Sequence, residues 1–180
     1  TQALLTAHSA PTAEGHLYEV DMRLRPSGRA GPVATSLGAF RDYQRTEAWT
    51  WEHLAQTRAR VLAGAEELAL DVENFRRELL VEKSGGETVR ADVQAMRIRL
   101  QEAKPGSMWD GKLGRGRLQD VELLAQTCAL LAGDSARRVE TQILAGRRTG
   151  ILSREEAEAV LASYRLRWRP ARLLYTSPSP

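Results

Sequence analysis

The segment GHLYEVDMRLRPSG, residues 15–28, alternates apolar and charged side chains and decides the fold of the chain's beginning. Its apolar members are Tyr18, Val20, Met22 and Leu24, and its charged members are Glu19, Asp21, Arg23 and Arg25. Alternation with a period of two predicts a half-buried strand over residues 16–25. A turn at Pro26-Ser27-Gly28 follows, and the short stretch Val33-Ala34-Thr35 is expected to return as a neighbouring strand.

The four charged side chains of the predicted strand are expected on one face, each about 7 Å from the next, because side chains alternate across a strand. Carboxylate oxygens can hold Mg²⁺, and guanidinium groups can neutralise phosphate oxygens. The face therefore suits a nucleotide. The solvated side of an amphipathic sheet has the same alternation, so the pattern alone leaves both interpretations open.

From residue 36 onward the hydrophobic period changes to that of helices. Ser36 is expected to cap a first helix, and a second helical run is expected over about residues 48–62. The later helices are predicted over residues 66–81, 87–103, 118–131, 135–145 and 153–167, the last with a capping box of Ser153 and Glu156. The predicted fold class is α+β and predominantly α-helical.

The linker Lys83 to Gly86 is predicted to divide the chain into a strand-bearing part, residues 1–83, and a helical domain, residues 87–174. The chain begins at Thr1 without an initiator methionine and ends in TSPSP, so we expect it to be cut at both ends. Alternating Ser and Pro cannot pack, and residues 175–180 are therefore expected to be a disordered or non-native tail.

Composition excludes several classes of protein. Hydrophobic residues make up 42% of the chain and charged residues 27%, as in soluble globular proteins. The 26 basic and 23 acidic residues nearly cancel, and no basic stripe carries interleaved aromatics, so no nucleic-acid partner is expected. Without a leader or a long apolar run, and with the single cysteine Cys128, the chain is predicted to be cytoplasmic and not membrane-bound.

Two groups of motifs resemble a known family. Residues 15–28, the run FRDYQRTEAWTWEH at 40–53 and Arg58-Ala59-Arg60 closely resemble the glutamine synthetase adenylyltransferase family. LYEVDMRLRPSG and AWTWEH are similar to the second of the family's two nucleotidyltransferase units, which adenylylates glutamine synthetase. WDGK at 109–112 and GRLQDVELLAQ at 116–126 resemble the segment that opens the helical domain after that unit, with Arg117 in place of a usual glycine.

The resemblance implies the carboxyl-terminal part of a nucleotidyltransferase-fold unit followed by a helical domain. It implies transfer of AMP from ATP, with Mg²⁺, to a tyrosine of glutamine synthetase in the regulation of nitrogen assimilation. Asp21 would be a catalytic residue and the metal's third carboxylate, and Arg23 and Arg25 would also be catalytic. Glu19 and Arg58, together with Arg23 and Arg25, would contact the nucleotide. For the parent protein the resemblance also implies the PII signalling protein as a partner and glutamine as an effector.

The family's upstream aspartate pair has no counterpart in this chain, so the isolated chain is expected to be inactive. The same omission supports a competing hypothesis, a helical docking module that binds glutamine synthetase or PII. The uridylyltransferase that modifies PII is a related rival, and the AWTWEH run argues against it.

Some residues outside the strand admit two interpretations. Trp49, Trp51, Glu52 and His53 form an aromatic and polar cluster, which is either a packed tryptophan pair or a brace for the charged strand face or the nucleotide. Glu122 lies near the apolar side of its helix, where it either pairs with an arginine or meets the catalytic unit. Cys128 is expected to be a small core residue. The three histidines have no metal-ligand spacing.

Overall fold

The computed structural model describes residues 2–13, 15, 26, 31–103, 106–107 and 110–176, with the side chains of residues 2, 4 and 169–176 excepted. Within these residues the helices are α1 (Gln2–Ser9), α2 (Leu37–Thr46), α3 (Thr50–Gln56), α4 (Glu66–Glu82), α5 (Val89–Ala103), α6 (Leu118–Leu131), α7 (Val139–Arg148) and α8 (Arg154–Thr176). The chain divides into two compact units, Thr1–Ala48 and Trp49–Pro180. The described part of the chain is predominantly helical, as the sequence predicted.

The first unit contains α1 and α2. Ser36 has extended backbone and its hydroxyl oxygen accepts a hydrogen bond from the backbone N–H of Ala39 at 3.2 Å, so the predicted cap of α2 is confirmed. The predicted strand over residues 16–25 lies outside the described residues. The prediction of a strand at Val33-Ala34-Thr35 was wrong, because this stretch consists of bends and irregular backbone directly after Pro32.

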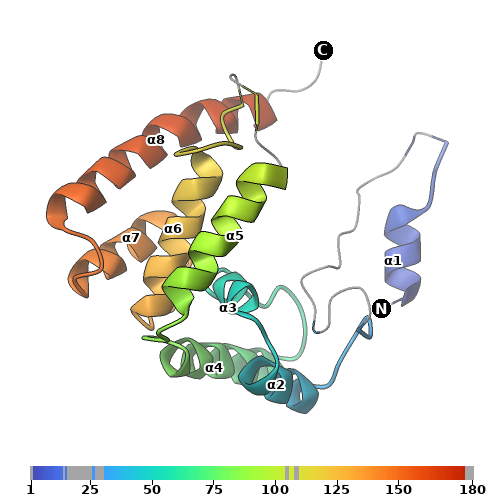
Figure 1. Cartoon of the computed structure of the whole chain (residues 1–180). Helices are drawn as coiled ribbons and strands as arrows, with labels where there is room; N and C mark the ends of the chain where they lie inside the picture. The colour runs from blue at the N-terminus through green and yellow to red at the C-terminus, as the bar shows by residue number, and fades with distance from the viewer. Residues whose placement is uncertain are drawn as a thin grey trace. The chain divides into compact units, whose positions relative to one another are not determined.

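The second unit is built around α6, which contacts α3, α5, α7 and α8 (Figure 1). This helix is apolar on nearly every side, which is the pattern of a helix buried all round. Leu123 and Leu130 face one core cluster with residues of α3, α4 and α5, whereas Ala125 and Cys128 face another with residues of α7 and α8. The core position predicted for Cys128 is confirmed.

Helices α6 and α7 approach closely where α7 carries a glycine. A Cβ atom placed on Gly146 would lie 2.6 Å from the sulfur of Cys128, closer than real Cβ contacts allow. Helix α6 ends at a second glycine, Gly133, whose φ of 60° lies in the left-handed region. The next backbone N–H, that of Asp134, donates to the carbonyl of Ala129 at 2.9 Å and closes the helix end.

Two predicted helices were wrong at an end where a short polar side chain bonds nearby backbone. The run predicted over residues 48–62 contains only α3, since the Thr57 hydroxyl donates back to the Leu54 carbonyl at 2.7 Å and the chain then leaves the helix. The helix predicted from Ser135 begins at Val139 instead, because Asp134 Oδ1 accepts the backbone N–H of Ala136 in a local turn. In both places a short polar side chain forms a hydrogen bond with backbone two or three residues away, and the helix does not include that residue.

Helices α4 and α6 and the start of α8 follow their sequence signals closely. Helix α6 has the predicted bounds, and α4 extends one residue beyond its prediction. The predicted capping box of α8 is confirmed, because Ser153 Oγ accepts the Glu156 N–H at 3.1 Å and Glu156 Oε2 accepts the Ser153 N–H at 2.8 Å. That helix continues to Thr176, beyond its predicted end at Arg167. Residues 177–180 of the predicted tail lie outside the described residues.

Candidate functional site

The strand residues chosen from the sequence, Glu19, Asp21, Arg23 and Arg25, lie outside the described residues. Arg58 is described, and its guanidinium lies on the surface with Nη1 3.6 Å from Glu122 Oε2. The arginine partner expected for Glu122 is therefore Arg58, which joins the end of α3 to α6. This surface ion pair stays open to solvent and contributes at most about 1 kcal/mol to stability.

The beginning of α3 places aromatic side chains outward and polar ones inward. Trp49 is 70% exposed and Trp51 38% exposed, whereas Glu52 and His53 are buried. The Glu52 carboxylate accepts the backbone N–H of Trp49 at 3.0 Å. Trp49 has extended backbone and is the N-cap residue that precedes α3. Within the described part of the chain, the indole rings of Trp49 and Trp51 do not form a buried, packed pair.

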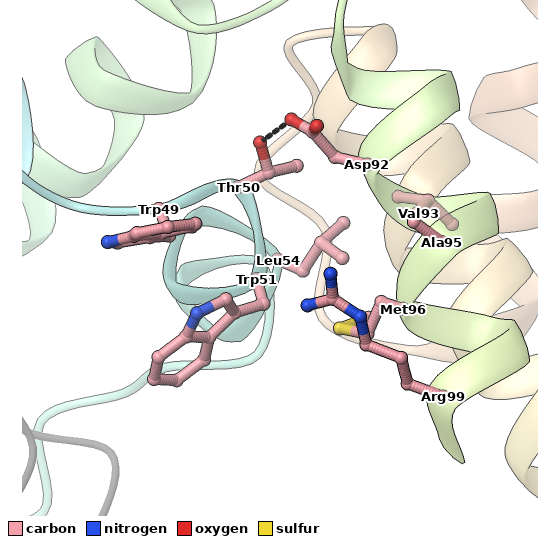
Figure 2. Close-up of a pocket in the computed structure, with 9 residues that line it drawn as sticks. All are labelled: Trp49, Thr50, Trp51, Leu54, Asp92, Val93, Ala95, Met96 and Arg99. Carbon is pink, nitrogen blue, oxygen red and sulfur yellow. Dashed lines mark hydrogen bonds between the residues drawn. The ribbon is translucent and has the colours of Figure 1, made fainter. Parts of the chain in front are cut away.

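A pocket of about 170 Å³ lies between the start of α3 and α5. Figure 2 shows its lining, which consists of Trp49, Thr50, Trp51, Leu54, Asp92, Val93, Ala95, Met96 and Arg99. The hydroxyl of Thr50 donates to Asp92 Oδ2 at 2.5 Å and ties the two helices together at one end of the pocket. Arg99 reaches from α5 toward Leu54 and Trp51 at the other end (Figure 2).

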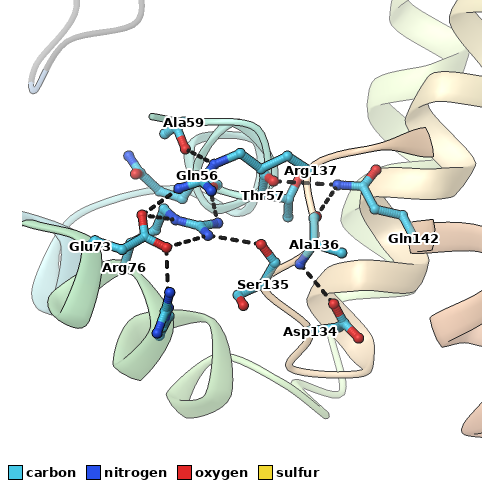
Figure 3. A network of polar contacts seen from close by, with 11 residues as sticks. Gln56, Thr57, Ala59, Glu73, Arg76, Asp134, Ser135, Ala136, Arg137 and Gln142 are labelled. Atoms are coloured by element: carbon cyan, nitrogen blue, oxygen red, sulfur yellow. Dashed lines mark hydrogen bonds and ion pairs between the residues drawn. The ribbon is translucent and has the colours of Figure 1, made fainter. Parts of the chain in front are cut away.

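A buried arginine network holds the opposite end of α3. Arg76 is 3% exposed and donates to both Glu73 carboxylate oxygens, at 3.1 and 2.9 Å. It also donates to the carbonyls of Gln56 at 3.1 Å and Ser135 at 2.8 Å (Figure 3). Arg137 donates to Glu73 as well, and to the Ala59 carbonyl at 2.7 Å. These bonds fix α4 to the segments that follow α3 and α6. We call Glu73, Arg76 and Arg137 the arginine clamp.

Hydrogen bonding from Arg76 lowers the pKa of Glu73 from 4.5 to about 2, with help from the charges of Arg76 and Arg137, although partial burial opposes the shift. Gln142 completes the surroundings of the clamp by donating from Nε2 to the Ala136 carbonyl at 2.9 Å and more weakly to the Thr57 carbonyl at 3.4 Å. Sequence reasoning missed this network. The one local signal was the spacing of Glu73 and Arg76, three residues apart on one helix face.

Residues 110–117, just before α6, form a loop that two side chains hold. Asp110 Oδ1 accepts the backbone N–H groups of Lys112 and Leu113 at 2.8 and 2.9 Å, and these bonds lower its pKa. Arg117 donates to the carbonyls of Ser107, Asp110 and Leu113, and its side chain closes the loop.

Asp120 faces a second pocket, of about 500 Å³, between α5, α6 and α8. Burial acts to raise the pKa of Asp120, but hydrogen bonds from Arg97 at 2.6 Å and from the Gly116 N–H at 2.7 Å lower it overall. The pocket is otherwise mainly apolar, with Leu123, Leu124 and Val160 among its lining residues. Its single ion pair is satisfied within the chain, so the pocket presents mostly a hydrophobic surface.

The described part of the chain contains no group of three or more His, Cys, Asp or Glu side chains placed to hold a metal ion. Cys128 is buried, and burial raises its thiol pKa to about 11, which keeps it protonated and unreactive near neutral pH. None of the described helices is long and apolar enough to cross a membrane.

Comparison with known proteins gives consistent matches. A family model described as glutamate-ammonia ligase adenylyltransferase matches residues 1–75. A Rhizobium meliloti protein named bifunctional glutamine synthetase adenylyltransferase/adenylyl-removing enzyme is 56% identical over 133 residues, which is 73% of this chain and 14% of the relative. A Bradyrhizobium diazoefficiens protein of the same name is 41% identical over 172 residues, covering 92% of this chain and 17% of the relative. The chain therefore spans about one sixth, or less, of the length of these relatives.

Proposed function

Because the chain belongs, as a segment, to the glutamine synthetase adenylyltransferase family, we propose that it is part of an enzyme that transfers AMP from ATP to a tyrosine of glutamine synthetase. The family match over residues 1–75 carries the proposal, because it includes the alternating acid and arginine segment at 19–25. We assign the segment to the adenylylating half, on the resemblance of LYEVDMRLRPSG and AWTWEH to the second nucleotidyltransferase unit. Residues 1–83 would then belong to that unit and 87–174 to the helical domain that follows.

The proposed site draws on the charged strand residues. Asp21 supplies a carboxylate to Mg²⁺, for which carboxylate oxygen is a suitable ligand, and two further carboxylates come from the parent protein. When bound there, Mg²⁺ would supply positive charge against the triphosphate oxygens. Arg23 and Arg25 contact the phosphates or orient Asp21, because a guanidinium offers paired hydrogen bonds to either. Glu19 and Arg58 contribute to nucleotide binding.

We also propose what the isolated chain can do, how the parent protein is regulated and where it acts. Since the carboxylate site is shared with residues outside this chain, the isolated chain does not transfer AMP. The helical domain connects the catalytic unit to regulation by PII and glutamine. The cytoplasm is the proposed compartment, and the single unpaired cysteine supports it.

A chimera tests this proposal. The segment of the Bradyrhizobium diazoefficiens relative that matches this chain is replaced by this chain's residues, and transfer of label from α-labelled ATP to glutamine synthetase is measured with Mg²⁺. We expect the chimera to transfer label and the isolated chain to transfer none. A folded chimera that transfers nothing, beside an active relative, would contradict the proposal. Binding of glutamine synthetase without transfer would favour the docking module instead.

A further inference from the structure

Two tryptophans stand on the surface at the start of α3. Trp49 and Trp51 are 70% and 38% exposed, although large aromatic side chains usually bury most of their area. Tryptophan and arginine are also the residues that most often dominate the binding energy of protein interfaces. Their exposure beside a hollow and an arginine therefore makes this face a candidate for binding.

The hollow is the pocket of about 170 Å³ between α3 and α5 (Figure 2). Leu54 and Met96 give it an apolar floor that continues into a buried core cluster. Cavities that hold drug-sized ligands run from about 300 to 1,000 Å³, so this pocket is too small for a complete ligand of that kind. Its size suits one inserted side chain, as in the anchor pockets of protein interfaces.

The charge of the pocket is uneven. Arg99 has no hydrogen bond or ion pair to any residue that the structure describes. Two positions earlier on α5, Arg97 is paired with Asp120 at 2.6 Å. At the other end of the pocket, the negative charge of Asp92 is held by Thr50. Asp92 and Arg99 are seven residues apart, about 10 Å along the helix, so the Arg99 end alone attracts an anion.

We propose that this pocket docks a protein segment in which an aromatic or aliphatic anchor side chain lies next to a carboxylate. The anchor enters between Trp51 and Met96 and covers apolar surface that is now open to water. The adjacent carboxylate pairs with Arg99, whose guanidinium is free to make a bidentate bond beside an indole ring. The carboxylate of the docked segment therefore lies at the Arg99 end of the pocket, away from Asp92. This inference does not rest on the adenylyl-transfer proposal.

The test uses the complete 180-residue chain with ¹⁵N-labelled tryptophan, and follows the indole N–H signals by NMR. The signals of Trp49 and Trp51 are assigned with the variants Trp49→Phe and Trp51→Phe. The probes are the peptides acetyl-Phe-Asp-Asp-amide and acetyl-Phe-Asn-Asn-amide, which differ only in charge, and AMP. We expect the acidic peptide to shift the Trp51 signal saturably and to bind about tenfold more tightly than the neutral one, because an ionic hydrogen bond is lost in the latter.

Variants separate the role of Arg99 from nonspecific attraction. We expect Arg99→Gln to weaken binding of the acidic peptide about tenfold and Arg90→Gln, an exposed arginine on the same helix outside the pocket, to leave it unchanged. Arg99→Lys keeps the positive charge but loses the paired N–H donors of the guanidinium, and it should therefore retain part of the affinity that Arg99→Gln loses. Equal binding of the two peptides, tighter binding of AMP, or no shift with any probe would overturn the proposal.

Discussion

Two arginines near opposite ends of α3 differ in almost every respect. Arg76 is 3% exposed and donates to Glu73 and to two backbone carbonyls (Figure 3). Arg99 is exposed, lines a pocket beside Trp51 and has no polar partner among the described residues (Figure 2). A buried arginine with its donors satisfied holds segments together, whereas an open one beside an aromatic ring is available to a partner. The clamp therefore serves stability, whereas the pocket lined by Trp49, Trp51 and Arg99, which we call the tryptophan face, serves recognition.

Removing the central arginine of the clamp should have the largest effect. Arg76→Met leaves Glu73 and the carbonyls of Gln56 and Ser135 without this donor, and we expect a loss of about 4 kcal/mol in the free energy of unfolding. Urea denaturation measures it. Arg77→Met is the matched control, since Arg77 contacts the same carboxylate but is 61% exposed, and it should cost less than about 1 kcal/mol. Equal losses would show that burial does not distinguish the two arginines.

Low pH should have the next largest effect on stability, because it weakens the arginine clamp. The pKa of Glu73 is about 2 in the folded chain and 4.5 in the unfolded reference, so the unfolded state binds more protons as the pH falls. The stability from this group is complete above pH 4.5 and is lost as the pH falls toward 2. In Glu73→Gln we expect a loss of about 2 kcal/mol at neutral pH and a flatter pH profile below 4.5. Glu102→Gln, which removes an exposed carboxylate near the end of α5, should retain the wild-type slope.

Adding a side chain at the close contact between α6 and α7 should lower the free energy of unfolding by a somewhat smaller amount. Gly146→Ala places a methyl group 2.6 Å from Cys128 Sγ, and we expect a loss of about 1.5 kcal/mol in the free energy of unfolding. The same substitution in a Cys128→Ala background should cost somewhat less, because the sulfur is removed, although the Cβ atom of residue 128 stays 2.8 Å from the added methyl group. A double-mutant cycle measures this coupling. No coupling would mean that the sulfur of Cys128 does not limit how closely the two helices approach.

The smallest effect is expected on the tryptophan face. Trp49→Ser removes a side chain that is 70% exposed, so its stability should change by no more than about 0.5 kcal/mol. Leu54→Ala, at a 2% exposed position of the same helix segment, should cost about 3 kcal/mol. Thermal or urea unfolding compares the two. A large loss for Trp49→Ser would place this residue in the structural core and break the contrast between the two regions.

Local signals in the sequence account for much of the helical fold. The period of apolar residues predicted α4 and α6 nearly to the residue, and Ser153 with Glu156 predicted the start of α8. The predictions failed where side chains bond nearby backbone, as at Thr57 and Asp134. Periodicity carries no information about such bonds, so these helix ends could not be located from it.

The clamp and the pocket were beyond sequence reasoning for a different reason. Arg137 and Glu73 are 64 residues apart, and only the packing of α4 against the loop after α6 brings them together. The exposure of Trp49 and Trp51 likewise depends on the extended backbone before α3 and on the position of α5. The charged strand residues could be selected from sequence because a period of two places them on one face without any tertiary information.

The role of Asp21 is the central claim about function, and label transfer by the chimera with Asp21→Asn tests it most directly. Asp42→Asn, an exposed carboxylate on α2, is the matched control. The account predicts that Asp21→Asn lowers transfer of AMP to glutamine synthetase by about 100-fold or more, because the metal site loses a charged ligand, while the unfolding midpoint stays unchanged. Transfer by Asp21→Asn equal to that of Asp42→Asn would contradict the account.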